Sequence, residues 1–134
     1  MTGELARQAL ASAFIARWVS AHPTYPCFIV GQSEPDLTTT TTPFCTFKTG
    51  VTRVHQSGLP VMRRYDGEME VGLYVPMGQG TLPFSTMIDT VTNQFTACSI
   101  SGIRMYGLTV LNRASAIGWQ SRILLVRFSF DSTD

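Results

Sequence analysis

The chain has 134 residues, of which 44% are hydrophobic. This length suits one domain with a single core and leaves no comfortable room for two. Ten basic and nine acidic residues give a formal charge of +1, which excludes a global field that would attract nucleic acid, an anionic membrane or an acidic substrate. Only 14% of the residues are charged, well below the roughly 25% of typical soluble domains, and this favours burial against protein neighbours.

The three cysteines, Cys27, Cys45 and Cys98, have no C-x-x-C spacing. An odd number without that spacing argues against a disulfide framework and a zinc site, and it predicts a reducing compartment. No apolar run reaches the roughly 18 residues that cross a bilayer, and Glu4 stands where a signal peptide would be positively charged. We therefore expect no membrane partner and assembly in the cytoplasm.

An opening helix is predicted over residues 2–20, where Thr2 can cap and neither proline nor glycine interrupts after Gly3. Its apolar stripe consists of Leu10, Phe14 and Trp18, widened by Leu5, Ala9, Ala13, Ala16 and Val19. Such a broad stripe predicts packing against a large surface.

A loop is predicted over residues 23–43, which contain four prolines and the threonine run 38–42. Within it only residues 28–30 resemble a strand. A β region rich in aromatic and β-branched residues then covers residues 44–55. The role of the threonine run stays open.

The clearest periodicity lies at residues 64–75, where apolar and polar residues alternate as in a strand with one dry face. Its apolar side carries Tyr65, Gly67, Met69, Val71, Leu73 and Val75, and its polar side Arg64, Asp66, Glu68, Glu70 and Tyr74. Gly78-Gln79-Gly80 follows and leads to a helix that begins near Pro83 and continues to Phe95. This loop resembles a phosphate-binding turn only in position, so we interpret it as a connector.

Further strands are predicted within residues 103–111 and over residues 120–130. Both sides of the last strand are apolar in its first half, which predicts a central position in the sheet. The fold class is therefore α+β, with the order α-β-β-β-α-β-β and two helices on one face of a largely antiparallel sheet. One domain over residues 1–134 is expected.

Candidate chemistry is sparse. Asp66, Glu68 and Glu70 share one side of a strand and could in principle act as an acid/base pair, but Arg64 beside them favours a solvated or partner-facing surface. His22 and His55 lie in no metal-binding motif. We therefore expect no reaction, no cofactor and no metal.

Three other residues are candidates for contacts. Arg53 and Arg63 could contact a partner, although they are a weak nucleic-acid signal without accompanying aromatic residues. Trp119 either anchors an interface or packs in the core, since tryptophan is common in both places.

The chain resembles phage tail terminator proteins of long-tailed phages. The resemblance rests on an alanine-rich opening helix, a proline-rich loop, the run from Arg64 through Glu70 to Pro76, Gly78-Gln79-Gly80, a short amphipathic helix, and Gly118-Trp119 leading into the final strand. It covers nearly the whole chain, and its motifs are patterns of element order with no catalytic signature.

The resemblance implies a structural virion protein at the head-proximal end of the tail. Such proteins form a ring, commonly a homohexamer, that caps the tail tube, stops its polymerisation and offers a head-joining surface. The implied partners are further copies of the chain, the major tail tube protein, a head-completion or neck protein, and genomic DNA that passes through without sequence-specific binding. The threonine run departs from the family pattern.

Two questions stay open at this point. Arg64, Asp66, Glu68 and Glu70 face either the lumen of the ring or a neighbouring subunit, where the carboxylates would pair with arginines. The alternatives to a tail terminator are another neck, connector or tail-completion subunit and, from a different class, a small hydrolase or ligand-binding domain. The last would need a concave site that joins His55, a cysteine and a carboxylate.

Overall fold

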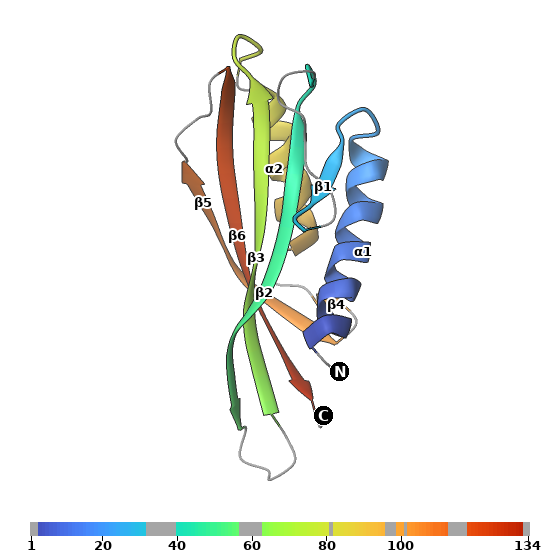
Figure 1. Ribbon diagram of the computed structural model, residues 1–134, viewed down its shortest axis with the longest axis vertical. Helices are drawn as coiled ribbons and strands as arrows, with labels where there is room; N and C mark the ends of the chain where they lie inside the picture. Colours follow the sequence, from blue (N-terminus) through green and yellow to red (C-terminus); the bar gives the residue numbers. More distant parts are fainter. Residues whose placement is uncertain are drawn as a thin grey trace.

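The computed structural model describes residues 3–31, 40–56, 63–80, 82–95, 99–100, 102–112 and 118–132. These residues form two helices and a six-stranded sheet (Figure 1). In chain order the elements are α1 (Gly3–Ala21), β1 (Cys27–Ile29), β2 (Phe44–Gln56), β3 (Arg63–Pro76), α2 (Leu82–Phe95), β4 (Ser99–Ile100), β5 (Ile103–Asn112) and β6 (Trp119–Ser132). The predicted α+β class and element order are confirmed, and the two-residue strand β4 is an addition to them.

The strands lie in the spatial order β1-β2-β3-β6-β5-β4. β1 runs parallel to β2, and every other neighbouring pair among the described strands is antiparallel. β6 lies between β3 and β5, so the central position predicted from its two apolar sides is confirmed. β3 and β6 pair over the whole length from Arg63 to Pro76, and these two long strands form the middle of the sheet.

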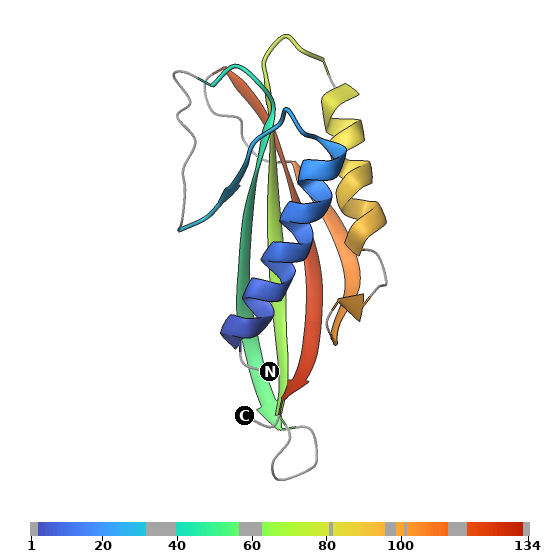
Figure 2. The same cartoon turned by 90° about the vertical axis from the view of Figure 1, so that its right-hand side faces the viewer.

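Both helices cover the same face of the sheet (Figure 2). Phe14 of α1 stacks on Phe47 of β2 at 4.8 Å between ring centroids and on Phe95 of α2 at 5.9 Å. Met69, Val71, Leu73 and Val75 of β3 are fully buried beneath the helices, so the dry side predicted for this strand is confirmed. Aromatic and aliphatic burial on this face supplies most of the driving force for folding.

The buried stripe of α1 is narrower than predicted. Ala6, Leu10, Phe14 and Trp18 are at most 1% exposed, but Leu5 is 53% and Val19 is 56% exposed. Ala16 is exposed too, so the expectation that these three residues widen the buried face was wrong, whereas Ala9 and Ala13 are half-buried as members of the wider stripe. The four fully buried residues follow one another at about one per turn, and Ala9 and Ala11 are partly buried against the same core.

The predicted strand at residues 28–30 and the predicted connector at residues 78–80 are both present, and the strand is shifted by one residue. The strand expected at residues 28–30 is β1, which begins one residue earlier at Cys27. Gly78 and Gly80 have φ angles of +92° and +76°, a left-handed conformation that glycine adopts without strain. In this connector the Gln79 side chain donates a hydrogen bond to the Thr41 carbonyl at 3.4 Å. Residues 38 and 39 of the threonine run lie outside the described residues.

Candidate functional site

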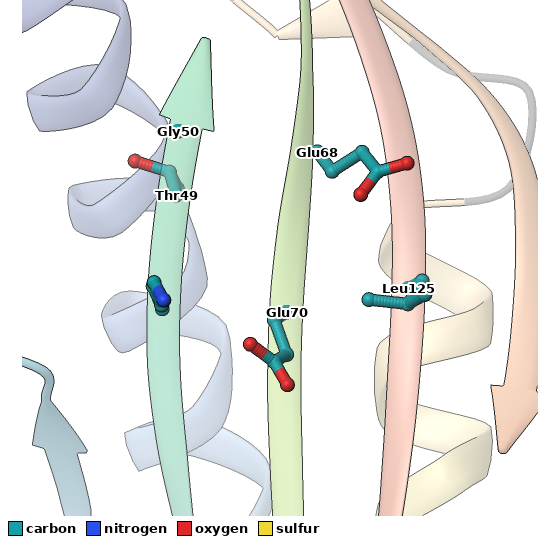
Figure 3. A pocket seen from close by; sticks show the side chains of 6 residues that line it. Thr49, Gly50, Glu68, Glu70 and Leu125 are labelled. Carbon is teal, nitrogen blue, oxygen red and sulfur yellow. The ribbon is translucent and has the colours of Figure 1, made fainter. Parts of the chain in front are cut away.

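The side of the sheet that faces away from the helices carries the charged residues singled out in the sequence, and we call it the open face. Arg64, Asp66, Glu68 and Glu70 all project onto it from β3, because alternate residues of a strand share one side. Figure 3 shows Glu68 and Glu70 on the side of the sheet opposite the helices, with Leu125 beside them. Glu68 is exposed, and the other three are half-buried.

Neighbouring strands place basic side chains opposite these acids. Residues that face each other across paired strands project to the same side of the sheet. The register sets Lys48 opposite Glu70 and Arg53 opposite Asp66, both across β2 and β3. It also sets Arg127 opposite Glu68 and Asp131 opposite Arg64, both across β3 and β6. β3 alone suggests an acidic surface, but the open face has mixed charge.

One ion-pair cluster lies at the end of the open face where β3 begins. Arg64 Nε donates to Asp131 Oδ1 at 3.1 Å, and Arg104 on β5 lies 3.8 Å from the other carboxylate oxygen. The hydrogen bond to Asp131 raises the pKa of Arg64 above its ordinary value. These side chains are more than one third exposed, and exposed ion pairs contribute little to stability.

The middle of the open face carries charges without such partners. Within the described part of the chain, Lys48, Glu68, Glu70 and Arg127 lie in no ion pair with an N–O distance of 4.0 Å or less. Charges in this state keep their hydration while they face water. They can therefore face a water-filled space or form ion pairs with a partner, but they resist burial against an apolar surface.

Two shallow hollows lie on the open face. One, of about 210 Å³, is lined by Lys48, Thr49, Gly50, Glu68, Glu70 and Leu125 (Figure 3). The other, of about 260 Å³, is lined by Val30, Thr46, Lys48, Glu70, Gly72 and Tyr74. A Cβ atom at Gly50 would meet nothing within 4 Å, so the surface is open there, whereas the space beside Gly72 is occupied by the side chains of Thr46 and Tyr74. Both hollows are smaller than the roughly 300–1,000 Å³ of ordinary ligand pockets, so their geometry suits surface contact.

Four aromatic residues pack together at the opposite end of the open face. The Phe44 ring stacks on Tyr74 at 4.7 Å, and it meets Phe28 and Trp119 edge-on at 5.5 Å and 5.0 Å. Trp119 is only 4% exposed. Of the two alternatives for this residue, the structure favours packing within the chain. The sequence offered no signal for the cluster, because its members come from four different strands.

Among the described residues, the remaining candidates lie on different parts of the fold. Cys27 and Cys45 lie on the helix-covered face of the sheet, opposite to the carboxylates, so these groups cannot share one centre. His22 stands at the end of α1, where its Nε2 lies 2.7 Å from Thr90 Oγ1. The side chain of His55 and all of Cys98 lie outside the described residues.

Arg53, in the last part of β2, and Arg63, the first residue of β3, are both exposed. No group of three His, Cys, Asp or Glu side chains in the described ranges is placed to hold a metal ion. Neither α1 nor α2 is both long and apolar enough to cross a membrane.

Comparison with known proteins shows a likeness of fold. No protein-family model and no curated protein sequence matches the chain. One solved structure, whose name states no function, superposes with a TM-score of 0.73 and 11% identity over 96% of this chain and 95% of its own. Another is a chain of the virion of a native gene transfer agent (GTA) particle, with a TM-score of 0.61 and 12% identity over 94% and 97% of the two chains.

Proposed function

We propose that this protein is a structural subunit of a phage or phage-like virion, and specifically a ring-forming tail terminator that caps the head-proximal end of the tail tube. The observation that carries the proposal is the superposition of 94% of the chain on a virion chain of a gene transfer agent particle. The resemblance of the sequence to tail terminators supports the finer role. The proposal assigns no reaction to the protein.

The subunit would act through its surfaces. Its partners are further copies of itself, the tail tube protein below and a head-completion or neck protein above, and DNA passes through the ring without being read. The shallow hollows and mixed charges of the open face support contact and passage over small-molecule binding.

In the proposed ring the open face lines the channel. Lys48, Glu68, Glu70 and Arg127 have no ion-pair partners among the described residues, and burying unpaired charges against a dry surface costs several kcal/mol for each ion. A water-filled channel avoids this cost. Its mixed-charge wall would neither bind DNA tightly nor repel it strongly.

The boundary between subunits would then include the outer side of α1. Leu5, Ile15 and Val19 are 53%, 37% and 56% exposed there, and their apolar surface gains roughly 25 cal/mol for each Å² removed from water. A helix that is apolar on the side away from its own core is typical of one buried on both sides. A second copy of the chain is the partner that a ring supplies.

The decisive experiment removes the protein from the particle. Electron microscopy of particles assembled without it is expected to show overlong tails that are not joined to heads, because nothing stops tube polymerisation. Complementation with the intact chain should restore normal tails. Tails of normal length that remain unattached to heads would instead assign the protein to another neck or connector position, and normal particles would overturn the virion role.

A measurement in solution tests the ring itself. Size exclusion with light scattering should show a closed oligomer, or a monomer that forms one on isolated tail tubes. A strictly monomeric protein that also fails to bind tail tubes would contradict the proposal.

A further inference from the structure

Cys27 and Cys45 face each other across β1 and β2. They are directly opposite in the parallel register, and both side chains lie on the helix-covered face. Two backbone hydrogen bonds fix this register: Cys45 N–H donates to the Pro26 carbonyl at 3.0 Å, and Val30 N–H donates to the Phe47 carbonyl at 2.9 Å. Neighbouring strands lie about 4.7–4.9 Å apart, within the range of roughly 4.4–6.8 Å that a disulfide spans between Cα atoms.

The two thiols differ in exposure and acidity. Cys45 is fully buried, and Cys27 is half-buried on the short edge strand. The hydrogen bond that the Cys45 thiol donates to Cys27 lowers the pKa of Cys27, whereas burial raises the pKa of Cys45 well above its ordinary value. The thiolate is the reactive form of cysteine. Cys27 is therefore the thiol that reacts first with an oxidant from solution. Cys45 lies next to it and is positioned to react with it in the second step.

We propose that Cys27 and Cys45 form a reversible disulfide that fastens β1 to β2 when the protein meets a disulfide oxidant. The Cys27 thiolate attacks one sulfur of glutathione disulfide, which gives a mixed disulfide and releases one glutathione thiolate. Cys45 then loses its proton and attacks Cys27 Sγ, which forms the Cys27–Cys45 bond and releases the second glutathione. The protein loses two electrons and two protons, and the oxidant is reduced to two glutathione thiols.

The bond would secure a weak part of the fold. β1 has only three residues and pairs with three residues of β2, and short edge strands open more readily than central ones. A disulfide here closes the segment between the two cysteines in the unfolded chain, which favours the folded state. This inference is independent of the virion role, because it concerns only chemistry within the chain.

The test uses glutathione disulfide on the folded protein. Cys98 is changed to serine, so that only two of the three cysteines remain. After oxidation both remaining thiols should resist alkylation in denaturant, where the reduced protein is alkylated at both, and peptide mapping by mass spectrometry should find one peptide pair joined between Cys27 and Cys45. The midpoint of thermal unfolding should rise by roughly 5–10 °C and return to its starting value on reduction.

Two controls keep the interpretation specific. Cys27→Ser and Cys45→Ala in the same background should show no oxidant-dependent rise, and Cys27→Ser keeps the packing of the buried Cys45 undisturbed. If both thiols can still be alkylated after oxidation, the proposal is overturned, and the two cysteines serve only to pack β1 against β2. A cross-link found only between two chains, seen as a dimer in non-reducing electrophoresis, would also overturn it.

Discussion

Among single residues, Gly67 lies at a place in β3 where the backbone of β2 and the ring of Phe128 leave no room for a side chain. A Cβ atom added at this position would lie 2.5 Å from the backbone oxygen of Gly50 and against the ring of Phe128. The backbone oxygen cannot move aside without breaking the pairing of β2 and β3. Overpacking of this kind typically costs about 1–3 kcal/mol.

We therefore predict that Gly67→Ala lowers the free energy of unfolding by about 1–3 kcal/mol. Gly50→Ala is the matched control on the neighbouring strand, since a Cβ there meets nothing within 4 Å. Urea unfolding followed by circular dichroism compares the two variants. Equal effects of the two substitutions would contradict the packing argument.

His22 gives a second prediction, on pH. Its ring stacks on Tyr25 at 5.5 Å and lies 4.6 Å from the Trp18 ring. Thr90 Oγ1 donates its own hydrogen to the Thr86 carbonyl at 3.1 Å, so it accepts a hydrogen bond from His22 Nε2. Burial lowers the pKa of His22 below its ordinary value, because the charged form is poorly solvated there.

The sign of the pH effect follows from this lowered pKa. In the unfolded chain His22 takes up a proton as the pH falls below about 6.5, whereas the folded chain resists it until a lower pH. The contribution of His22 to stability is therefore fully present well above about pH 6.5 and is progressively lost as the pH falls below that value, because only the unfolded chain then takes up the proton. Thermal unfolding from pH 7.5 downwards should show a steeper loss for the wild type than for His22→Gln. Parallel pH profiles would rule out this role for His22.

Among the elements, helix α1 has two apolar sides, of which one is buried in the core and the other is exposed. Its inner side contacts the core through Ala6, Leu10, Phe14 and Trp18, and its outer side exposes Leu5, Ile15 and Val19. Phe14 has aromatic neighbours on β2 and α2 as well as on α1 itself. Loss of the Phe14 ring would remove contacts both with the sheet and with the second helix.

Phe14→Ala should lower the free energy of unfolding of the monomer by about 3–5 kcal/mol. Val19→Ser on the same helix should change it by less than about 0.5 kcal/mol, because the side chain is already in water. Chemical denaturation at a concentration below oligomer formation compares them. A large effect of Val19→Ser under these conditions would mean that its side chain packs within the chain.

At the scale of the whole molecule, the two exposed surfaces are predicted to have different roles in the ring. Charge reversal by Glu68→Lys with Glu70→Lys should leave the oligomer intact and change DNA passage, because these residues are proposed to face the channel. Val19→Glu should dissociate the oligomer, since it introduces a charge into the proposed subunit boundary.

Asn93→Glu supplies a control, because it adds the same charge at an exposed position of the other helix. Light scattering measures the oligomer, and DNA ejection from assembled particles measures passage. Dissociation by the Glu68 and Glu70 changes with an intact Val19→Glu ring would reverse the proposed orientation and place the carboxylates between subunits.

Both helices, the long strands and the two sides of β3 could be predicted from the sequence alone. The alternation along residues 64–75 was enough to assign Met69 and Val71 to the core and Glu68 and Glu70 to the opposite face, because a strand repeats every two residues whatever surrounds it. The apolar first half of the last strand likewise predicted its central place.

The residue that lies opposite each strand residue could not be predicted in this way and is known only from the fold. Pairing between distant strands set Lys48 opposite Glu70 and Arg127 opposite Glu68, which turned an apparently acidic strand into part of a mixed-charge face. The same pairing brought Cys27 beside Cys45 and left Val19 outside the core. Periodicity specifies the side on which a residue projects, but strand order and register specify its neighbours, and these depend on how the whole chain packs.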